Sequence, residues 1–186
     1  MCIRDSYLSE RIGQLQNLKL LWAEDQRWPR RLGYQQRLCV WPEGLNTINW
    51  LLQVSICNCD LRHLPDSLGQ LWNLEGLILN HNVLEKLPTS LGQLWSLKYL
   101  RLGWNLLTHL PESVGKLWKL EDLDLQNNGL TDLPNSMASL WGLQNCNVVG
   151  NPIDRESWID TPPHRDVYRK CGPMQLPPYC GPYSPV

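Results

Sequence analysis

The sequence predicts an α/β solenoid, a horseshoe with a parallel sheet on its concave side and short helical or irregular segments on its convex side. Two observations lead to this fold class. First, a leucine-rich pattern recurs every 23 residues in segments that begin at Leu71, Leu94, Leu117 and Leu140, and Ile48 opens an earlier unit in the same frame. Second, the central units carry a Leu-x-Leu core, then a polar turn residue and a Leu-Pro pair, which is the order of a strand, a turn and a return segment.

One unit shows how the sheet is expected to form. In Leu77-Ile78-Leu79 the period of two directs Leu77 and Leu79 into the core and Ile78 to the opposite face. Strands of successive units run in the same direction, so their backbones can pair into one continuous parallel sheet. Each repeat therefore adds one strand and one layer of core.

An asparagine follows the strand at a fixed position. Its amide can donate and accept, so it can satisfy backbone groups where the chain leaves the sheet. Cys59 takes this position in its unit and is expected to form weaker hydrogen bonds. Leu87-Pro88 and its counterparts begin the convex return, where proline ends strand pairing. The recurring asparagines are Asn82, Asn105, Asn128 and Asn151.

A column of tryptophans comes before the strands, at Trp72, Trp95, Trp118 and Trp141. Each of them lies near two core leucines, which favours a packed ladder of rings at the entry to the strands. The alternative is a binding surface for carbohydrate or for proline-rich segments, formed by the same row of indoles.

The first unit departs from the regular repeat. Leu15 and Ile48 occupy equivalent positions but lie 33 residues apart, so an insertion is expected near residues 25–36. A decayed edge repeat is the alternative. Residues 1–6 resemble the translation of a sequencing adapter and are set aside as a scar, which leaves the solenoid over residues 7–153.

The segment after residue 153 is expected to close the array. An open solenoid end exposes core side chains, so a cap is predicted over residues 154–170. Residues 171–186 are rich in proline and are predicted to be extended or disordered. A docking peptide for a proline-recognising domain is the alternative. The candidates to cover the open end are Trp158, Ile159, Val167 and Tyr168.

The repeat resembles a known family. The pattern LxxLxxLxLxxNxLxxLPxxLGxL is similar to the intracellular leucine-rich-repeat class of Ras-pathway scaffolds and plant Ras-group-related repeat proteins. The resemblance covers about Leu8 to Ile153 and implies a horseshoe fold, no cofactor, and protein–protein recognition through the concave face. The tryptophan column, Cys59 and the first-unit insertion depart from the pattern. The matching residues of one unit are Leu71, Leu74, Leu77, Leu79, Asn82, Leu84, Leu87, Pro88, Leu91 and Gly92.

Composition argues against several function classes. The formal net charge is -1, so a surface for nucleic acid is not expected. The apolar runs are too short for a membrane span, and the start lacks the apolar core of a secretory signal. No metal constellation, phosphate-cradling loop or nucleophile–base pair is visible, so the chain is predicted to be neither an enzyme nor a cofactor-binding protein. His63 and His109 share one convex column, which the repeat explains better than catalysis does.

Seven cysteines are present. Reduced thiols in a cytoplasmic protein are the favoured interpretation, because Cys57 and Cys59 have no partner pair at metal-ligand spacing. A bridge between Cys171 and Cys180 in an oxidising compartment is the alternative.

The predicted partner-binding site lies on the concave face. His81 is expected to stack on Trp104 one strand away, and Arg101 to lie beside Asp124. Aromatic and arginine side chains are enriched at binding hot spots, so Tyr99, Arg101 and Trp104 form its centre. The full set of predicted binding residues is Ile78, His81, Tyr99, Arg101, Trp104, Asp122, Asp124 and Asn127.

Charge on the predicted concave face describes the expected partner. Three basic residues oppose six acidic ones, so a protein with a basic or mixed-charge surface and an apolar anchor is expected. The function predicted is a scaffold or adaptor in intracellular signalling. The alternatives are the recognition arm of a larger receptor or enzyme and an extracellular recognition domain. The charged residues are Lys19, Lys98 and Arg101 against Glu24, Asp25, Glu75, Glu121, Asp122 and Asp124.

Overall fold

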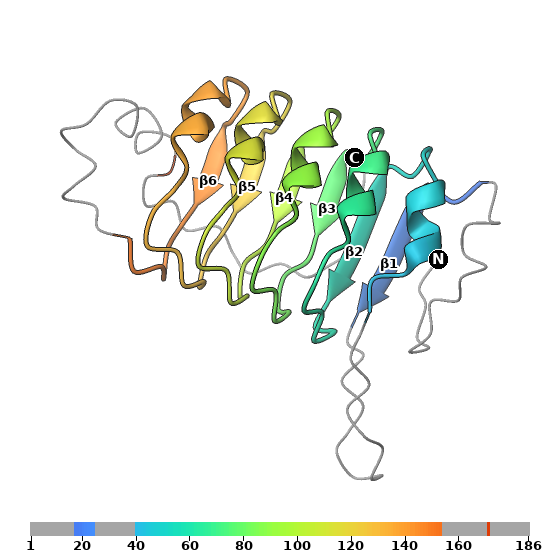
Figure 1. Cartoon of the computed structure of the whole chain (residues 1–186), viewed down its shortest axis with the longest axis horizontal. Helices are drawn as coiled ribbons and strands as arrows, with labels where there is room; N and C mark the ends of the chain where they lie inside the picture. Colours follow the sequence, from blue (N-terminus) through green and yellow to red (C-terminus); the bar gives the residue numbers. More distant parts are fainter. Residues whose placement is uncertain (1–16, 25–39, 154–170, 172–186) are drawn as a thin grey trace, which may run out of the picture.

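The computed structural model describes residues 17–24, 40–153 and 171. Within them, six strands form one parallel sheet in the order β1-β2-β3-β4-β5-β6 (Figure 1). This arrangement confirms the predicted solenoid. The strands are β1 (Leu20–Glu24), β2 (Gln53–Cys57), β3 (Gly76–Ile78), β4 (Tyr99–Arg101), β5 (Asp122–Asp124) and β6 (Asn145–Asn147).

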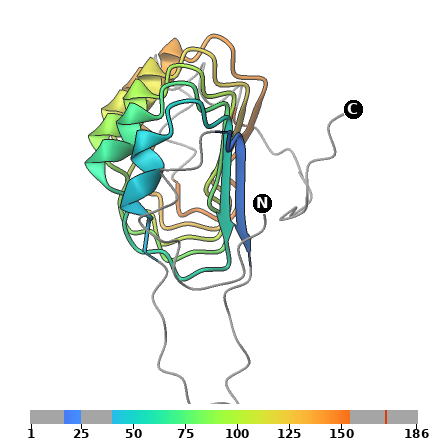
Figure 2. The same cartoon turned by 90° about the vertical axis from the view of Figure 1, so that its right-hand side faces the viewer.

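Short 3-10 helices form the opposite side of each unit (Figure 2). A proline precedes each of them in an extended conformation, as Pro88 does with φ -69° and ψ 148°. The chain then turns through i+3 hydrogen bonds such as Leu91 N–H to Pro88 O at 3.1 Å. Proline suits this start, because its ring fixes φ near the value that the turn needs. The helices are η3 (Glu43–Thr47), η4 (Asp66–Gln70), η5 (Thr89–Gln93), η6 (Glu112–Lys116) and η7 (Asn135–Ser139).

The strand register follows the repeat. Gly76 pairs with Tyr99, Tyr99 with Asp122, and Asp122 with Asn145, so each partner is one repeat further along the chain. Between β1 and β2 the step is longer, because Leu20 pairs with Gln53. The extra length of chain lies between these two strands, and its residues 25–39 are outside the described part.

The core is a stack of aliphatic side chains between the sheet and the 3-10 helices. Leu77 and Leu79 of the third unit are 0% exposed, as the alternation of the strand predicts. Leu100 is 1% exposed and Leu123 is 0% exposed in the next two units. No unit encloses its leucines alone, so each one is stabilised by its neighbours in the stack.

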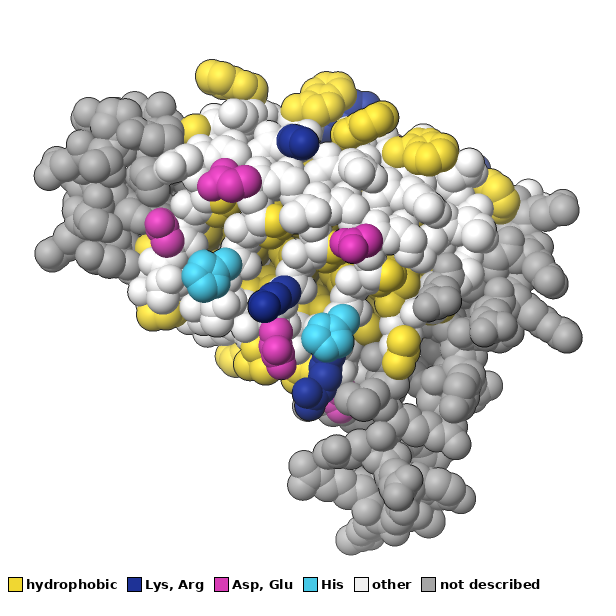
Figure 3. Space-filling model, viewed as in Figure 1, with side chains coloured by type: hydrophobic (Ala, Val, Ile, Leu, Met, Phe, Trp, Pro, Cys, Tyr) yellow, Lys and Arg dark blue, Asp and Glu magenta, His cyan; other side chains and the backbone are white. Residues whose placement is uncertain are grey.

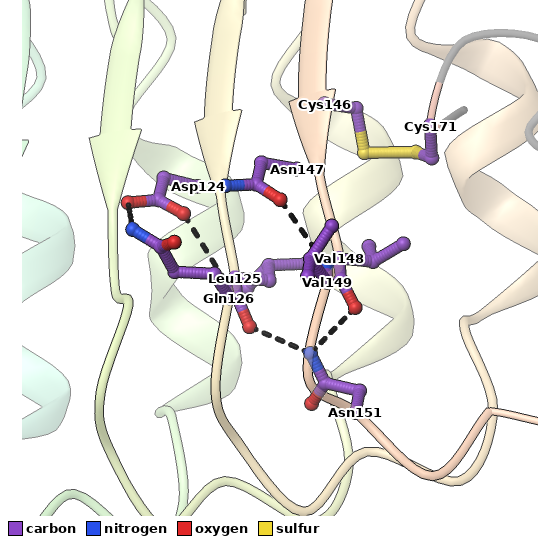
Figure 4. Close-up of a disulfide and its surroundings, with 9 residues drawn as sticks. All are labelled: Asp124, Leu125, Gln126, Cys146, Asn147, Val148, Val149, Asn151 and Cys171. Carbon is purple, nitrogen blue, oxygen red and sulfur yellow. Dashed lines mark hydrogen bonds between the residues drawn. A yellow bond between two sulfur atoms is a disulfide. The ribbon is translucent and has the colours of Figure 1, made fainter. Parts of the chain in front are cut away.

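The recurring asparagine bonds two units together. Asn105 donates through Nδ2 to Leu79 O of the preceding strand at 3.0 Å and to Leu102 O of its own strand at 2.9 Å. Its Oδ1 accepts from Leu84 N–H at 3.0 Å. Asn151 repeats the two donations to Leu125 O and Val148 O (Figure 4). The predicted role of the amide is confirmed.

Cys59 replaces this asparagine in the second unit. Its Sγ lies 3.1 Å from Cys57 O and 3.6 Å from Ala23 O, so its single S–H can donate to a carbonyl of its own unit or of the preceding one. It is 3% exposed. One weak S–H donor thus replaces the two N–H donors of the amide, and the hydrogen bonding is weaker, as the sequence predicts.

The cysteine prediction is wrong at the C-terminal end of the sheet. Cys146, in β6, forms a disulfide with Cys171 (Figure 4). The expected reduced state of these two thiols and the alternative Cys171–Cys180 bridge are both overturned, because residue 171 lies against the last strand. Cys57 and Cys59 are buried. Cys180 lies outside the described residues.

The tryptophan prediction is also wrong. Trp72, Trp95, Trp118 and Trp141 are 46%, 57%, 58% and 84% exposed. The leucines on either side point into the core, and the residue between them must point away from it. These indoles therefore project from the edge where the helices lead into the strands, and they do not pack into a ladder inside the molecule.

Several predictions fall on residues that are not described. They are the proposed scar at residues 1–6, the insertion near residues 25–36, the cap over residues 154–170 and the Pro-rich segment after Cys171. Among the helices of the described chain, none has the length and apolar character that crossing a bilayer requires.

Candidate functional site

The outward side chains of the strands form one continuous surface, called the sheet face below. They stand in columns, because each strand position pairs with the position one repeat later. One column holds Gln53, Gly76, Tyr99, Asp122 and Asn145. The next column holds Ser55, Ile78, Arg101, Asp124 and Asn147.

A third column, called the turn column below, follows the end of the strands. Its backbone is left-handed in every described unit from the second on, with φ of 55° at Asn58, 56° at His81, 59° at Trp104, 52° at Asn127 and 76° at Gly150. Asparagine and glycine adopt this conformation readily, whereas a bulky side chain pays about 1–2 kcal/mol for it. Histidine is also enriched in this conformation, so Trp104 is the one residue of the five that the turn itself does not favour, and it and His81 are the two that carry rings.

Those two residues form an aromatic platform. The rings of His81 and Trp104 stack with centroids 5.5 Å apart and an interplanar angle of 14°, as the sequence predicts. Trp104 is still 47% exposed. The backbone of both turns is held by pairing to the next unit, as in His81 N–H to Gly103 O at 3.0 Å and Trp104 N–H to Gln126 O at 2.8 Å. The platform is thus a rigid, solvent-facing apolar surface.

A cation and two carboxylates lie beside the platform. Arg101 lies beside Asp124 in the strand register, as expected, and its Nη2 is 3.4 Å from Oδ2 of Asp122. Asp124 occupies the paired position on β5, but its own oxygens are engaged elsewhere. Oδ1 of Asp122 is buried and accepts no hydrogen bond from the described residues. Asp122 is only 7% exposed, so leaving one of its carboxylate oxygens without a hydrogen bond lowers the stability of the folded chain.

Asp124 closes its own turn. Its Oδ1 accepts from Gln126 N–H at 3.1 Å, and its Oδ2 accepts from Gln126 Nε2 at 3.2 Å. Burial raises the pKa of this carboxyl, while the bonds from Gln126 and the charge of Arg101 oppose the rise. Asn147 makes the equivalent bond to Val149 N–H at 3.1 Å (Figure 4). An uncharged amide thus serves the same turn one unit later.

An ion pair marks the opposite border of the sheet face. Lys98 Nζ lies 3.0 Å from Glu75 Oε2 across two units. The hydrogen bond to Glu75 raises the pKa of Lys98. Both side chains are solvent-accessible, so the pair contributes little to stability.

The predicted binding residues differ in how much of them a partner can touch. Ile78, Asp122 and Asp124 are 9%, 7% and 6% exposed, so they form the floor of the site. Trp104 is exposed, and the side chains between these extremes are partly exposed. The accessible set is therefore His81, Tyr99, Arg101, Trp104 and Asn127.

The convex side holds a small hollow of about 230 Å³ between the units that begin at Leu94 and Leu117. It is below the usual range of about 300–1,000 Å³ for small-molecule sites. His109 and Asp132, which belong to successive units, both contribute to it. Its lining is His109, Leu110, Glu112, Asp132, Leu133, Pro134 and Asn135.

The left-handed geometry of the turn column is the feature that sequence reasoning missed. The signal was present, because asparagine or glycine occupies three of its five positions at the 23-residue step. Such residues at one fixed position indicate positive φ. Histidine is also compatible with positive φ, so Trp104 is then the exception in a turn-forming column, and its residue type alone singles it out.

Comparisons with known proteins support the fold. The family model described as Leucine Rich Repeat matches residues 119–140. No curated protein matches the sequence.

Among solved structures, a leucine-rich-repeat protein of Leptospira interrogans has a TM-score of 0.56 at 26% identity, over 88% of this chain and 50% of that one. The ectodomain of the plant receptor kinase GASSHO1/SCHENGEN3 from Arabidopsis thaliana, in complex with CASPARIAN STRIP INTEGRITY FACTOR 2, has a TM-score of 0.63 at 27% identity. That match covers 76% of this chain and 16% of the ectodomain. An internalin of Listeria monocytogenes, inlF, has a TM-score of 0.59 at 19% identity, over 82% and 46% of the two chains.

The chain spans half or less of the length of these structures. The recurring motif, the single parallel sheet and these matches together show a leucine-rich-repeat solenoid.

Proposed function

We propose that this chain is a protein-interaction module that binds its partner on the sheet face, at the platform of His81 and Trp104. Leucine-rich-repeat proteins generally mediate protein–protein interaction, and the matching plant ectodomain is in complex with a partner. Tyr99 and Arg101 lie on β4, the strand that leads into Trp104, and extend the platform toward the ion-pair border.

One observation carries the proposal. Trp104 combines a left-handed backbone with φ of 59° and a side chain 47% exposed. Each feature costs free energy in the isolated chain, and asparagine at the equivalent position of other units avoids both costs. A partner that covers the indole recovers the cost of exposing it. Tryptophan, tyrosine and arginine are also the residue types most enriched among binding hot spots.

The partner that fits this surface has an apolar or aromatic anchor for the platform and a donor-rich group beside it. The donor is expected because Oδ1 of Asp122 has no hydrogen-bond partner within the described residues. A hydrogen-bond donor from the partner that reached Oδ1, while Arg101 stays at Oδ2, would satisfy that oxygen. This agrees with the predicted partner of basic or mixed charge.

The test begins with peptides selected from a random displayed library on the intact chain. We expect selected binders to combine an aromatic residue with lysine or arginine. Their affinity for a Trp104→Asn variant should fall by about tenfold or more. Asparagine is chosen because Asn58 and Asn127 already occupy the same turn position.

Leu106→Ala is the matched control, because Leu106 is 54% exposed but lies past the turn, outside the sheet face. It should bind as the unchanged chain does. If the Trp104→Asn and Leu106→Ala variants bind the selected peptides equally well, the sheet face is not the binding site.

The compartment and the pathway belong to the same proposal. A cytoplasmic signalling adaptor of the Ras-pathway or plant Ras-group class is the interpretation that the repeat pattern favours. The Cys146–Cys171 bridge favours the alternative, an extracellular recognition domain, because disulfides persist in oxidising compartments. Counting thiols in the protein from its native source, with and without reductant, decides between the two.

A further inference from the structure

A second apolar surface lies away from the sheet face. Hydrophobic side chains project in a row along the upper edge of the molecule, above the 3-10 helices (Figure 3). The tryptophan ridge comprises Trp72, Trp95, Trp118 and Trp141, with exposed fractions of 46%, 57%, 58% and 84%. A contiguous row of exposed indoles is rare on a protein surface unless something binds it.

The backbone fixes the direction of these side chains. Each tryptophan lies between a 3-10 helix and a strand, and the turn is closed by bonds such as Trp95 N–H to Gln93 O and Trp118 N–H to Lys116 O, both at 2.9 Å. The leucine just before each indole and the one two residues after it are buried. The ridge is therefore preorganised, and a ligand needs to order little of it on binding.

The spacing of the ridge selects a type of ligand. Parallel strands lie about 4.8 Å apart, so alternate indoles of successive units are separated by about 9.6 Å. A polyproline-II helix repeats every three residues at about 3.1 Å each, which is about 9.3 Å per turn. Proline rings on one side of such a helix can therefore rest on alternate indoles along the ridge. Aromatic-lined surfaces bind proline-rich segments in this way.

The chain itself contains a segment of this kind. Residues 172–186 include five prolines among fifteen residues and no charged side chain. The segment begins beside Cys171, which is bonded to Cys146 in the same unit as Trp141. In the polyproline-II conformation fifteen residues extend about 46 Å, while the ridge from Trp141 to Trp72 crosses three strand spacings, about 14 Å.

We propose that residues 172–186 dock on the tryptophan ridge of their own chain as a polyproline-II segment anchored by the Cys146–Cys171 disulfide. Because the anchor holds the segment near the ridge, its effective concentration there is of millimolar order, and weak ring contacts are enough for binding. An uncharged segment brings no charge of its own to be desolvated on the indoles. The ammonium of Lys119, which lies 4.9 Å from the centroid of the Trp118 ring, can swing into solvent on its flexible side chain when the segment covers that ring.

The test uses the full chain, with a nitroxide attached at Cys180 after Cys2 and Cys39 are replaced by serine. Cys57 and Cys59 are buried, which limits their labelling. The indole N–H signals of the ten tryptophans are recorded by NMR and assigned by single Trp→Phe substitutions. We expect the ridge signals to lose most of their intensity, while Trp104, past the other end of its strand, keeps its signal.

A variant of the segment separates docking from chance proximity. Pro177→Ser with Pro178→Ser removes the restricted φ of the segment without touching the folded units, so the ridge signals should recover. Gln175→Ser is the matched control and should leave the broadening unchanged. Equal broadening of Trp104 and the ridge, or no recovery in the proline variant, would overturn the proposal.

A mixing experiment identifies the source of the segment. Isotope-labelled chain without nitroxide is mixed with spin-labelled chain of natural isotope content. Docking within one chain predicts no broadening in this mixture. Broadening there would show that the ridge takes the segment of a second copy, which contradicts docking within the chain.

Discussion

Two adjacent columns of the molecule follow opposite rules. The asparagine column, Asn82, Asn105, Asn128 and Asn151, holds one residue type in four successive units and bonds each unit to the one before it. The turn column, one residue earlier, keeps one left-handed backbone but changes its side chain in almost every unit. The first column is constrained by hydrogen bonds to the neighbouring unit, whereas the second is constrained only in its backbone.

The contrast shows how a repeat protein separates stability from recognition. At Asn105 the side chain itself is required, because its amide serves three buried backbone groups. At Trp104 only the turn is required, so the side chain is free to be selected for binding. Positions that repeat in residue type should therefore dominate stability, and positions that repeat only in conformation should dominate affinity.

The largest expected effect is at a repeated position. Asn105→Ala removes bonds to Leu79 O, Leu102 O and Leu84 N–H. The N–H of Leu84 is left buried without its partner, whereas each carbonyl loses one of its two amide donors and keeps the other, from Asn82 or Asn128. We expect a loss of about 4 kcal/mol in the free energy of unfolding, measured by urea titration. A loss below about 1 kcal/mol would mean that water replaces the amide and that the column is not structural.

The core leucines test the same rule at the sheet. Leu100 is 1% exposed at the centre of β4, so Leu100→Ala should cost about 3 kcal/mol. The outward neighbour Tyr99 is the reference, and Tyr99→Ala should cost clearly less in the same titration. Equal losses would contradict the inward and outward assignment of this strand.

The helix stack offers a smaller effect with a matched control. A Cβ on Gly115 would lie 2.5 Å from the Cβ of Ser136 in the next unit. Gly115→Ala should therefore cost about 2 kcal/mol by overpacking, read from the thermal midpoint. At Gly129 the nearest atom would be 3.5 Å away, so Gly129→Ala should be close to neutral. Similar shifts for the two variants would show that the units are not in close contact here.

The turn column should respond in the opposite direction. Trp104→Asn relieves the left-handed strain and should raise stability by up to about 1 kcal/mol, even though it weakens partner binding. Chemical denaturation of both chains measures the difference. A loss of more than about 1 kcal/mol would show that the indole is structural, and the distinction between the two columns would fail at this position.

The smallest effect concerns pH. The folded-state pKa of Asp124 lies above its ordinary 3.8. The Asp124 carboxyl therefore binds its proton more tightly in the folded chain than in the unfolded chain. Above its folded pKa the ionised carboxylate lowers the free energy of unfolding. Asp124→Asn should be slightly more stable near neutral pH, and its advantage should vanish below about pH 4. If the extra stability of Asp124→Asn did not change with pH, burial of the ionised carboxylate would not be its cause.

Much of the fold was predictable, because the same pattern of leucines, asparagine and proline recurs in successive units. The leucines, Asn105 and Pro88 each occupy their predicted places. The orientation of Trp95 was not predictable from leucine spacing, since a residue between two buried leucines in a turn points outward regardless of its own hydrophobicity. The disulfide between Cys146 and Cys171 was not predicted either, because spacing along the chain does not reveal that residue 171 returns to the last strand.

Within the site, the sequence located the surface but not its contacts. His81 and Trp104 stack as register alone requires, since they occupy one column. Arg101 lies beside Asp124 in the register, as predicted, but its guanidinium also reaches Asp122, while Asp124 accepts hydrogen bonds from Gln126. Register fixes Cα neighbours, whereas competition among hydrogen-bond donors decides which side chains meet.

The amide bridge between units also bears on how such an array can change length in evolution. Asn105 and Asn128 bond the preceding strand and their own in the same way, so each junction is interchangeable with the next. A gene duplication or deletion of one whole 23-residue unit would join ends that already match. The array can thus be lengthened or shortened in single steps without a new junction, while a partial unit would leave one set of carbonyls without its amide.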